Sequence, residues 1–117
     1  MWTIRTAQMN AIADETFERV VARITAATAA EYPEVWFALR EGFEPWVRGL
    51  LNSAVTLDIT REENLRRFVA WNADLGVETS LAEEHPWAIE MLGVTDEDEE
   101  ARIEAVELRL QGLEGEP

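Results

Sequence analysis

The sequence predicts an all-α fold, a compact bundle of about five to six helices with no sheet. Apolar residues recur at intervals of three and four over long stretches, which is the spacing of one helix face, and no stretch alternates as a half-buried strand would. Proline and glycine divide these stretches at points where helices commonly begin and end. With 117 residues, the chain is expected to form one domain, residues 1–117, that buries its own core.

The first long helix is expected to run from Thr6, which offers an N-cap, to about Glu31, after a short extended segment at residues 2–5. Pro33 ends this helix, because proline disfavours helical geometry in the residue before it and lacks a backbone donor. The helix keeps its apolar spacing through Met9, Ile12, Ala13, Phe17, Val20, Val21, Ile24 and Ala27.

Residues 34–40 are densely apolar and are expected to form a short helix, with a buried extended segment as the alternative. Pro45 suits the first turn of the next helix, which is expected to end near Leu57. Gly49 lies inside that helix and weakens it relative to alanine, which indicates close contact with a neighbouring helix.

A middle helix is expected to begin at Thr60, because Glu63 follows three residues later as in a capping box, and to close at Gly76. One face is apolar through Leu65, Phe68, Val69, Asn72 and Leu75. Trp71 lies off this face, so it belongs either to a second buried face or to an exposed interaction patch. Trp46 and Trp87 each follow a proline at a helix start and are interpreted as core anchors.

The last third of the chain is expected to hold a loop at residues 77–84, a short helix from Pro86 to Gly93 and a final helix at about 96–111. Thr95 can cap the final helix, whose early acidic residues complement the positive end of its dipole. Beyond it a frayed tail is expected. The final helix is expected to pack in the bundle or against another chain through an apolar stripe. The stripe consists of Ile103, Val106, Leu110 and Leu113.

Charge restricts the partners of this chain, which carries 24 acidic and 10 basic residues and a net charge of −14. Nucleic acids and anionic membranes would repel such a protein, so a basic protein is the expected partner. No apolar run approaches the roughly 20 residues of a membrane span, and the first residues do not resemble a signal peptide. A cytoplasmic protein is therefore expected.

The side chains available for chemistry are few: there is no cysteine or lysine, and His85 is the single histidine. Most pairs of nucleophile and base are thus impossible, and no enzyme activity and no cofactor are expected. Glu83 and Glu84 precede His85 but lack the helical spacing of a metal site, so His85 is expected to cap a helix or cover Trp87. A calcium loop starting at Asp96 fails because Ala101 stands where glycine is required.

Several short motifs resemble a family of small helical accessory proteins that bacteria encode beside type VI secretion effectors and related toxins. The resemblance covers about residues 1–93 and rests on Gln8-Met9, Tyr32-Pro33, Asp58-Ile59-Thr60-x-x-Glu63, Phe68-Val69, Leu75-Gly76 and Pro86-Trp87-Ala88-Ile89-x-Met91-Leu92. It implies a non-enzymatic protein that binds an effector, either neutralising it as an immunity protein or assisting its loading.

Together these observations predict an acidic binding protein, because an acidic helical surface can cover the basic cleft of a toxin. The partner-binding candidates are Trp71, Asp96, Asp98, Glu99, Glu100, Glu104 and Glu107. One alternative is a homodimeric module joined through the Ile103, Val106, Leu110 and Leu113 stripe. Another is a small metal-assisted enzyme built around His85.

Overall fold

The computed structural model describes the backbone of residues 2–114 and the side chains of residues 16–112. Within residues 2–114 the chain is all-α, as the sequence predicts, with six helices of seven residues or more and one single-turn helix. The elements are α1 (Trp2–Glu31), α2 (Pro33–Leu39), the 3-10 turn η1 (Arg40–Gly42), α3 (Phe43–Thr56), α4 (Glu62–Leu75), α5 (Leu81–Glu84), α6 (Pro86–Leu92) and α7 (Glu99–Glu114).

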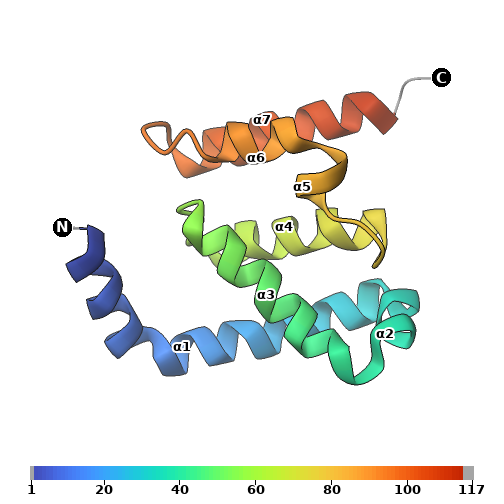
Figure 1. Ribbon diagram of the computed structural model, residues 1–117, viewed down its shortest axis with the longest axis horizontal. Coiled ribbons are helices and arrows are strands. Elements are labelled where there is room, and N and C mark those ends of the chain that lie inside the picture. Colours follow the sequence, from blue (N-terminus) through green and yellow to red (C-terminus); the bar gives the residue numbers. More distant parts are fainter. Residues whose placement is uncertain (1, 115–117) are drawn as a thin grey trace.

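The helices are stacked in three tiers (Figure 1). The long helix α1 and the short α2 form the bottom, α3 and α4 cross the middle, and α5, α6 and α7 form the top. Helix α3 contacts both α1 and α4, while α6 contacts α5 and α7. In the described part of the chain, no helix combines the length and the apolar character that crossing a bilayer requires.

Proline and glycine set several helix boundaries as the sequence predicts. Pro33 and Pro86 occupy the first turns of α2 and α6, where the missing backbone donor is not needed. Gly76 follows α4 with a φ of 96°, a left-handed conformation in which a side chain would be strained. The short segment after Pro33 is helical rather than extended.

Three predicted boundaries are wrong. Residues 2–5 belong to α1 rather than to an extended segment, and no proline or glycine interrupts the chain between there and Glu31. The segment predicted as a loop contains α5, whose first free donors are capped by the Ser80 hydroxyl accepting from the backbone N–H of Glu83. The last helix begins at Glu99 instead of residue 96, and Asp98 rather than Thr95 precedes it, accepting a hydrogen bond from the Glu100 N–H.

The apolar core runs through all three tiers. It consists of Val21, Ile24, Val35, Phe43, Val47, Leu51, Ala54, Ile59, Leu65, Phe68, Val69, Trp71, Ala73, Leu81, Ala88, Leu92, Ile103 and Val106. Trp46 and Trp87 are half-buried against this core, which confirms their interpretation as anchors. Gly49 is exposed, and an added Cβ there would meet no atom within 4 Å, so the predicted close helix contact is wrong.

The α7 stripe is part of this core. Ile103 and Val106 have exposed fractions of 0% within the single chain. Leu110 is half-buried against the core, and the side chain of Leu113 lies outside the described residues. Ile103 and Val106 therefore pack against helices of their own chain, and a homodimer joined through this stripe stays a prediction.

Candidate functional site

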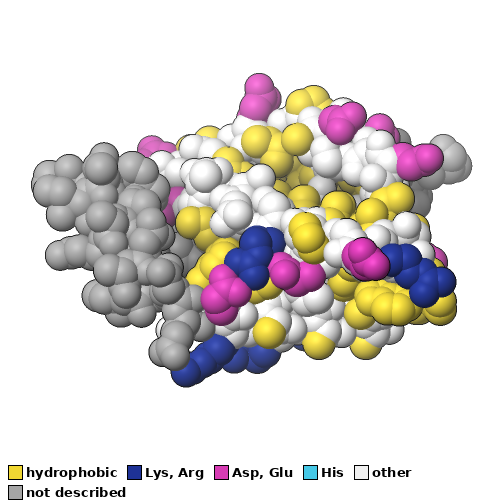
Figure 2. Space-filling view, turned by 60° about the horizontal axis from the view of Figure 1, so that its bottom comes forward, with side chains coloured by type: hydrophobic (Ala, Val, Ile, Leu, Met, Phe, Trp, Pro, Cys, Tyr) yellow, Lys and Arg dark blue, Asp and Glu magenta, His cyan; other side chains and the backbone are white. Residues whose placement is uncertain are grey.

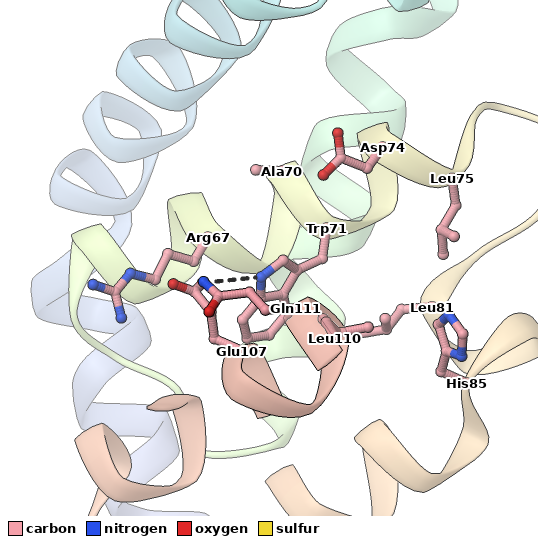
Figure 3. A pocket seen from close by; sticks show the side chains of 10 residues that line it. All are labelled: Arg67, Ala70, Trp71, Asp74, Leu75, Leu81, His85, Glu107, Leu110 and Gln111. Atoms are coloured by element: carbon pink, nitrogen blue, oxygen red, sulfur yellow. Dashed lines mark hydrogen bonds between the residues drawn. The ribbon is translucent and has the colours of Figure 1, made fainter. Parts of the chain in front are cut away.

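A pocket of about 480 Å³ opens between α4, α5 and α7 (Figure 3). Its apolar lining comes from Ala70, Trp71, Leu75, Leu81 and Leu110, and its polar lining from Arg67, Asp74, His85, Glu107 and Gln111. Helical spacing explains the grouping, because residues three and four apart on α4 and on α7 project from the same face. The volume lies within the range of roughly 300 to 1,000 Å³ that is typical of ligand sites.

Trp71 forms the inner wall of this pocket. The residue is 9% exposed, and its indole Nε1 donates a hydrogen bond of 3.2 Å to the Glu107 carboxylate on α7. Phe68 meets its ring edge-on, with centroids 6.5 Å apart. Trp71 thus belongs to a second buried face of α4, and the alternative of a fully exposed aromatic patch is wrong.

Asp74 stands at the rim of the pocket and interacts with Tyr32 at the end of α1. Burial, together with the hydrogen bond to Asp74 and its negative charge, raises the pKa of Tyr32 to about 12. This shift widens the pH range over which the phenol keeps its proton for the contact with Asp74. Asp74 itself remains exposed, so its carboxylate is accessible from solvent.

His85 lines the opposite side of the pocket, between α5 and α6. Its ring lies 5.5 Å from the ring of Trp87, as the interpretation of a covering histidine predicts, and it makes no side-chain cap to α6. Among residues whose side chains are described, no group of three or more histidine or acidic side chains is placed to hold a metal ion.

Glu99 has a structural task that the sequence did not reveal. Its carboxylate accepts hydrogen bonds from the backbone N–H groups of Thr60 and Arg61, each at 3.1 Å, and one of 2.8 Å from the Asn64 amide. It thereby caps α4, whose N-cap residue Arg61 has no side-chain cap of its own. The predicted capping box between Thr60 and Glu63 is wrong, because a carboxylate from α7 takes these donors instead.

The pKa of Glu99 reflects this position. Burial alone would raise the pKa, but the hydrogen bonds from Asn64, Thr60 and Arg61 outweigh it and hold the pKa below its usual value of 4.5. Glu100 also accepts from Asn64 and Arg61, and these contacts likewise lower its pKa. Both side chains are therefore already engaged within the chain, although the sequence offered them as partner-binding candidates.

The other candidates on α7 and before it have different surroundings. Asp96, Asp98 and Glu104 are exposed, and Asp98 holds the first turn of α7 through its contact with the Glu100 N–H. Glu107 is half-buried beside Trp71. The structure therefore brings together Trp71 and Glu107 in the pocket, and places Asp96 and Glu104 on the open surface.

Arg102 has a structural role that the sequence did not predict. The residue is 4% exposed, and its guanidinium donates to the backbone carbonyl oxygens of Leu57, Leu92 and Glu97 at 2.9, 2.6 and 3.1 Å. A longer contact of 3.4 Å reaches the carbonyl of Asp58. These carbonyls lie at or beyond the ends of α3 and α6, where a positive charge complements the helix dipole. Its place beside the apolar stripe was the one signal in the sequence.

Charge is distributed unevenly between the lower tiers and the top tier. Residues 76–112, here called the acidic layer, contain eleven acidic residues and two arginines, a net charge of −9. Residues 16–75 contain nine acidic residues and seven arginines, a net charge of −2. The two arginines of the layer are occupied, because Arg102 is buried and Arg109 lies 4.2 Å over the ring of Trp87.

In the lower tiers, arginine side chains neutralise acidic ones through ion pairs. Arg23 contacts Glu62 at 2.6 Å, and Arg48 reaches Glu18 at 2.6 Å. In the view of Figure 2, dark blue arginine side chains lie in the lower part, several beside magenta acidic ones, whereas magenta side chains at the upper edge have no dark blue neighbour. The acidic layer therefore presents most of the uncompensated negative charge.

A second exposed surface lies on α2. Trp36 and Phe37 are 39% and 59% exposed, and their rings meet edge-on with centroids 5.2 Å apart. Arg40 lies over both rings at 5.4 and 5.1 Å and has a φ of 51°, which is strained for a residue with a side chain. Figure 2 shows hydrophobic and arginine side chains together at the right-hand end of the molecule, where α2 lies.

Comparison of the chain with protein-family models, with curated proteins and with solved structures gives no match.

Proposed function

We propose that this chain is a non-enzymatic acidic binding protein whose acidic layer and adjoining pocket hold a basic protein partner. The carrying observation is the segregation of charge, with −9 on residues 76–112 against −2 on residues 16–75. Complementary charge steers a basic protein toward such a surface and fixes its orientation there. The pocket beside Trp71 supplies the apolar recess in which binding energy is commonly concentrated.

The partner class in this proposal is a secreted antibacterial effector. The sequence resemblance to accessory proteins of type VI secretion clusters supports it, and the acidic surface has the sign needed to cover a basic catalytic cleft. The protein would then act in the cytoplasm, as a toxin inhibitor of the immunity type or as an assistant in effector loading. The absence of cysteine and lysine and the single histidine limit the nucleophile–base pairs that the chain can form, which supports a role in binding rather than catalysis.

Affinity capture from a lysate of the source cell tests the partner class. The tagged protein is incubated at low and at high salt, and proteins that co-purify are identified by mass spectrometry. We expect one basic, toxin-like protein at low salt and its loss at high salt, because exposed charges are screened within about 10 Å at 0.1 M ionic strength. Recovery of the protein alone, as a stable dimer at both salt concentrations, would contradict the proposal.

Charge neutralisation tests whether the acidic layer is the surface in contact. Glu83, Glu90 and Glu104 are exposed on α5, α6 and α7, and their replacement by glutamine leaves the described hydrogen bonds intact. We expect the triple variant to lose roughly tenfold in affinity for the captured partner at low salt, because three complementary charges are removed. Calorimetry or biolayer interferometry measures the change.

The matched control replaces three exposed acids outside the layer, Glu34, Glu41 and Glu63, by glutamine. This variant has the same net charge as the first, so overall charge cannot account for a difference between the two. We expect the control to bind within about threefold of the unaltered protein, since screening weakens distant charges. Equal losses in both variants would show that binding does not use the layer in particular.

A further inference from the structure

We infer that the pocket beside Trp71 receives an arginine side chain from the basic partner. This inference rests on the proposed function and names the chemistry by which the partner is recognised. The guanidinium would lie against the indole of Trp71 and the aliphatic stem against Leu75 and Leu110, three residues that line the pocket from α4 and α7 (Figure 3). Arginine suits such a site, because its planar cation stacks on aromatic faces and pairs with carboxylates.

The tryptophans of this chain give the first argument. Arg40 lies over Trp36 at 5.4 Å, and Arg109 lies over Trp87 at 4.2 Å, so two indoles already carry a guanidinium from the same chain. Trp71 has no such cation over its ring among the described residues, although it borders an open pocket. Its orientation is fixed by the hydrogen bond from Nε1 to Glu107, so the ring is preorganised for stacking.

Charge around the pocket gives the second argument. Asp74 on α4 and Glu107 on α7 contribute two carboxylates to the lining, whereas Arg67 contributes one guanidinium. The pocket also borders the acidic layer, whose net charge of −9 favours a cation over an anion. Asp74 is exposed, so it can pair with an incoming guanidinium without losing the contact to Tyr32.

A substitution at Arg67 can test whether the pocket prefers a cation or an anion. This residue lines the pocket from α4 and makes no hydrogen bond or ion pair with a described side chain. Removing its charge should strengthen the binding of a cation and weaken the binding of an anion. The Arg67→Gln variant therefore separates an arginine-binding pocket from a carboxylate-binding one.

The experiment titrates the whole protein with blocked tetrapeptides, acetyl-Gly-Gly-Arg-Gly-amide and the matched peptides with citrulline or glutamate in place of arginine. The indole N–H resonance of Trp71, assigned by its loss in a Trp71→Phe variant, reports binding by NMR. We expect that signal to shift in the millimolar range with the arginine peptide only. Citrulline has nearly the same shape without the charge, so an equal response to it would overturn the proposal.

Variants at the rim complete the test. We expect Arg67→Gln to strengthen binding of the arginine peptide about threefold and Asp74→Asn to weaken it about threefold, as expected for single charges in contact with solvent. Preserved amide spectra show that both variants remain folded. A weaker arginine complex with Arg67→Gln, or stronger binding of the glutamate peptide to the unaltered protein, would contradict the inference.

Failure of this inference can be distinguished from failure of the proposed function. If a basic partner is captured and binds both rim variants as tightly as the unaltered protein, the pocket inference is wrong and the acidic layer still explains binding. If the arginine peptide binds as described but no basic protein is captured from the lysate, the proposed function is wrong while the pocket chemistry stands.

Discussion

Two residues of α7 act as charged caps for other helices. Glu99 brings a carboxylate to the N-terminus of α4, where free N–H groups and the helix dipole favour negative charge. Arg102, three positions later, brings a guanidinium to the C-terminal carbonyls of α3 and α6. Each charge therefore satisfies backbone groups that local sequence leaves without partners.

Replacing Glu99 by alanine should lower the free energy of unfolding by about 1 kcal/mol at neutral pH, the usual effect of losing a helix cap. Because the pKa of Glu99 is lower in the folded chain than its usual value of 4.5, the unfolded chain is protonated first on acidification. Its contribution is therefore complete above pH 4.5 and is lost as the pH falls through the folded-state pKa.

Urea denaturation between pH 3 and 7 measures both effects. The control is Glu104→Ala on the same helix, an exposed residue that should change the unfolding free energy by no more than about 0.5 kcal/mol. An unchanged acid dependence in the Glu99 variant would show that its hydrogen bonds to α4 do not contribute to stability.

Residue-scale interactions of this kind lie beyond local sequence rules. The spacing of Thr60 and Glu63 fits a capping box, yet Glu99, 39 positions after Thr60, supplies the acceptor. Arg102 is a similar case: its place beside the apolar stripe is a signal of burial, but its carbonyl partners on Leu57 and Leu92 lie 45 and 10 positions away in the chain. By contrast, the interpretation of His85 as a cover for Trp87 is confirmed, since the two residues are sequence neighbours.

At the scale of elements, the position of α7 depends on its contacts with the ends of α3 and α6. Its apolar residues Ile103 and Val106 enter the core, and its neighbour in the top tier is α6. Arg102 connects this helix to the ends of α3 and α6. The docking of α7 therefore combines apolar burial with a small number of charge-assisted hydrogen bonds.

Arg102→Met should loosen α7 selectively, because the carbonyls of Leu57 and Leu92 lose a charged donor in a buried setting. We expect the free energy of local opening of α7 to fall by about 2 kcal/mol. The substitution should therefore accelerate amide hydrogen exchange more in α7 than in α1. Arg109→Met is the control on the same helix, with an expected loss under about 1 kcal/mol from its contact with Trp87. Uniform acceleration in all helices would contradict a local role.

Helix boundaries were predictable where a residue enforces them locally. Pro33, Gly76 and Pro86 restrict the backbone by their own geometry, and the structure follows each of them. Helix α5 was missed because its four residues are too few for a periodic pattern, although Ser80 caps it. The role of Gly49 was misread because a glycine in a helix does not by itself specify a neighbour.

At the scale of the whole molecule, uncompensated negative charge collects in the top tier. The lower tiers pair many of their acids with arginines, whereas the acidic layer retains a net charge of −9. Composition predicts an acidic surface but not which acids remain free, because Glu99 and Glu100 are occupied by Asn64 and Arg61. The pocket likewise depends on the meeting of α4 with α7, which no local pattern encodes.

Raising the salt concentration from 10 to 300 mM should raise the melting temperature by about 2 to 4 °C, because screening relieves repulsion within the acidic layer. Exposed ion pairs such as Arg23–Glu62 oppose this effect but contribute little each, so repulsion should dominate. Differential scanning calorimetry measures the change. The Glu83, Glu90 and Glu104 triple glutamine variant should show a smaller rise, and a fall with salt would indicate that ion pairs dominate instead.

The position of the two charged caps has a consequence for biosynthesis. Helices α3, α4 and α6 precede α7 in the chain, so the ribosome delivers them before it has made Glu99 and Arg102. Until those residues emerge, three helix ends lack their partners, and the surface later covered by Ile103 and Val106 stays open. The nascent chain should thus remain protease-sensitive and available to chaperones until α7 leaves the ribosome, and fold as a unit only then.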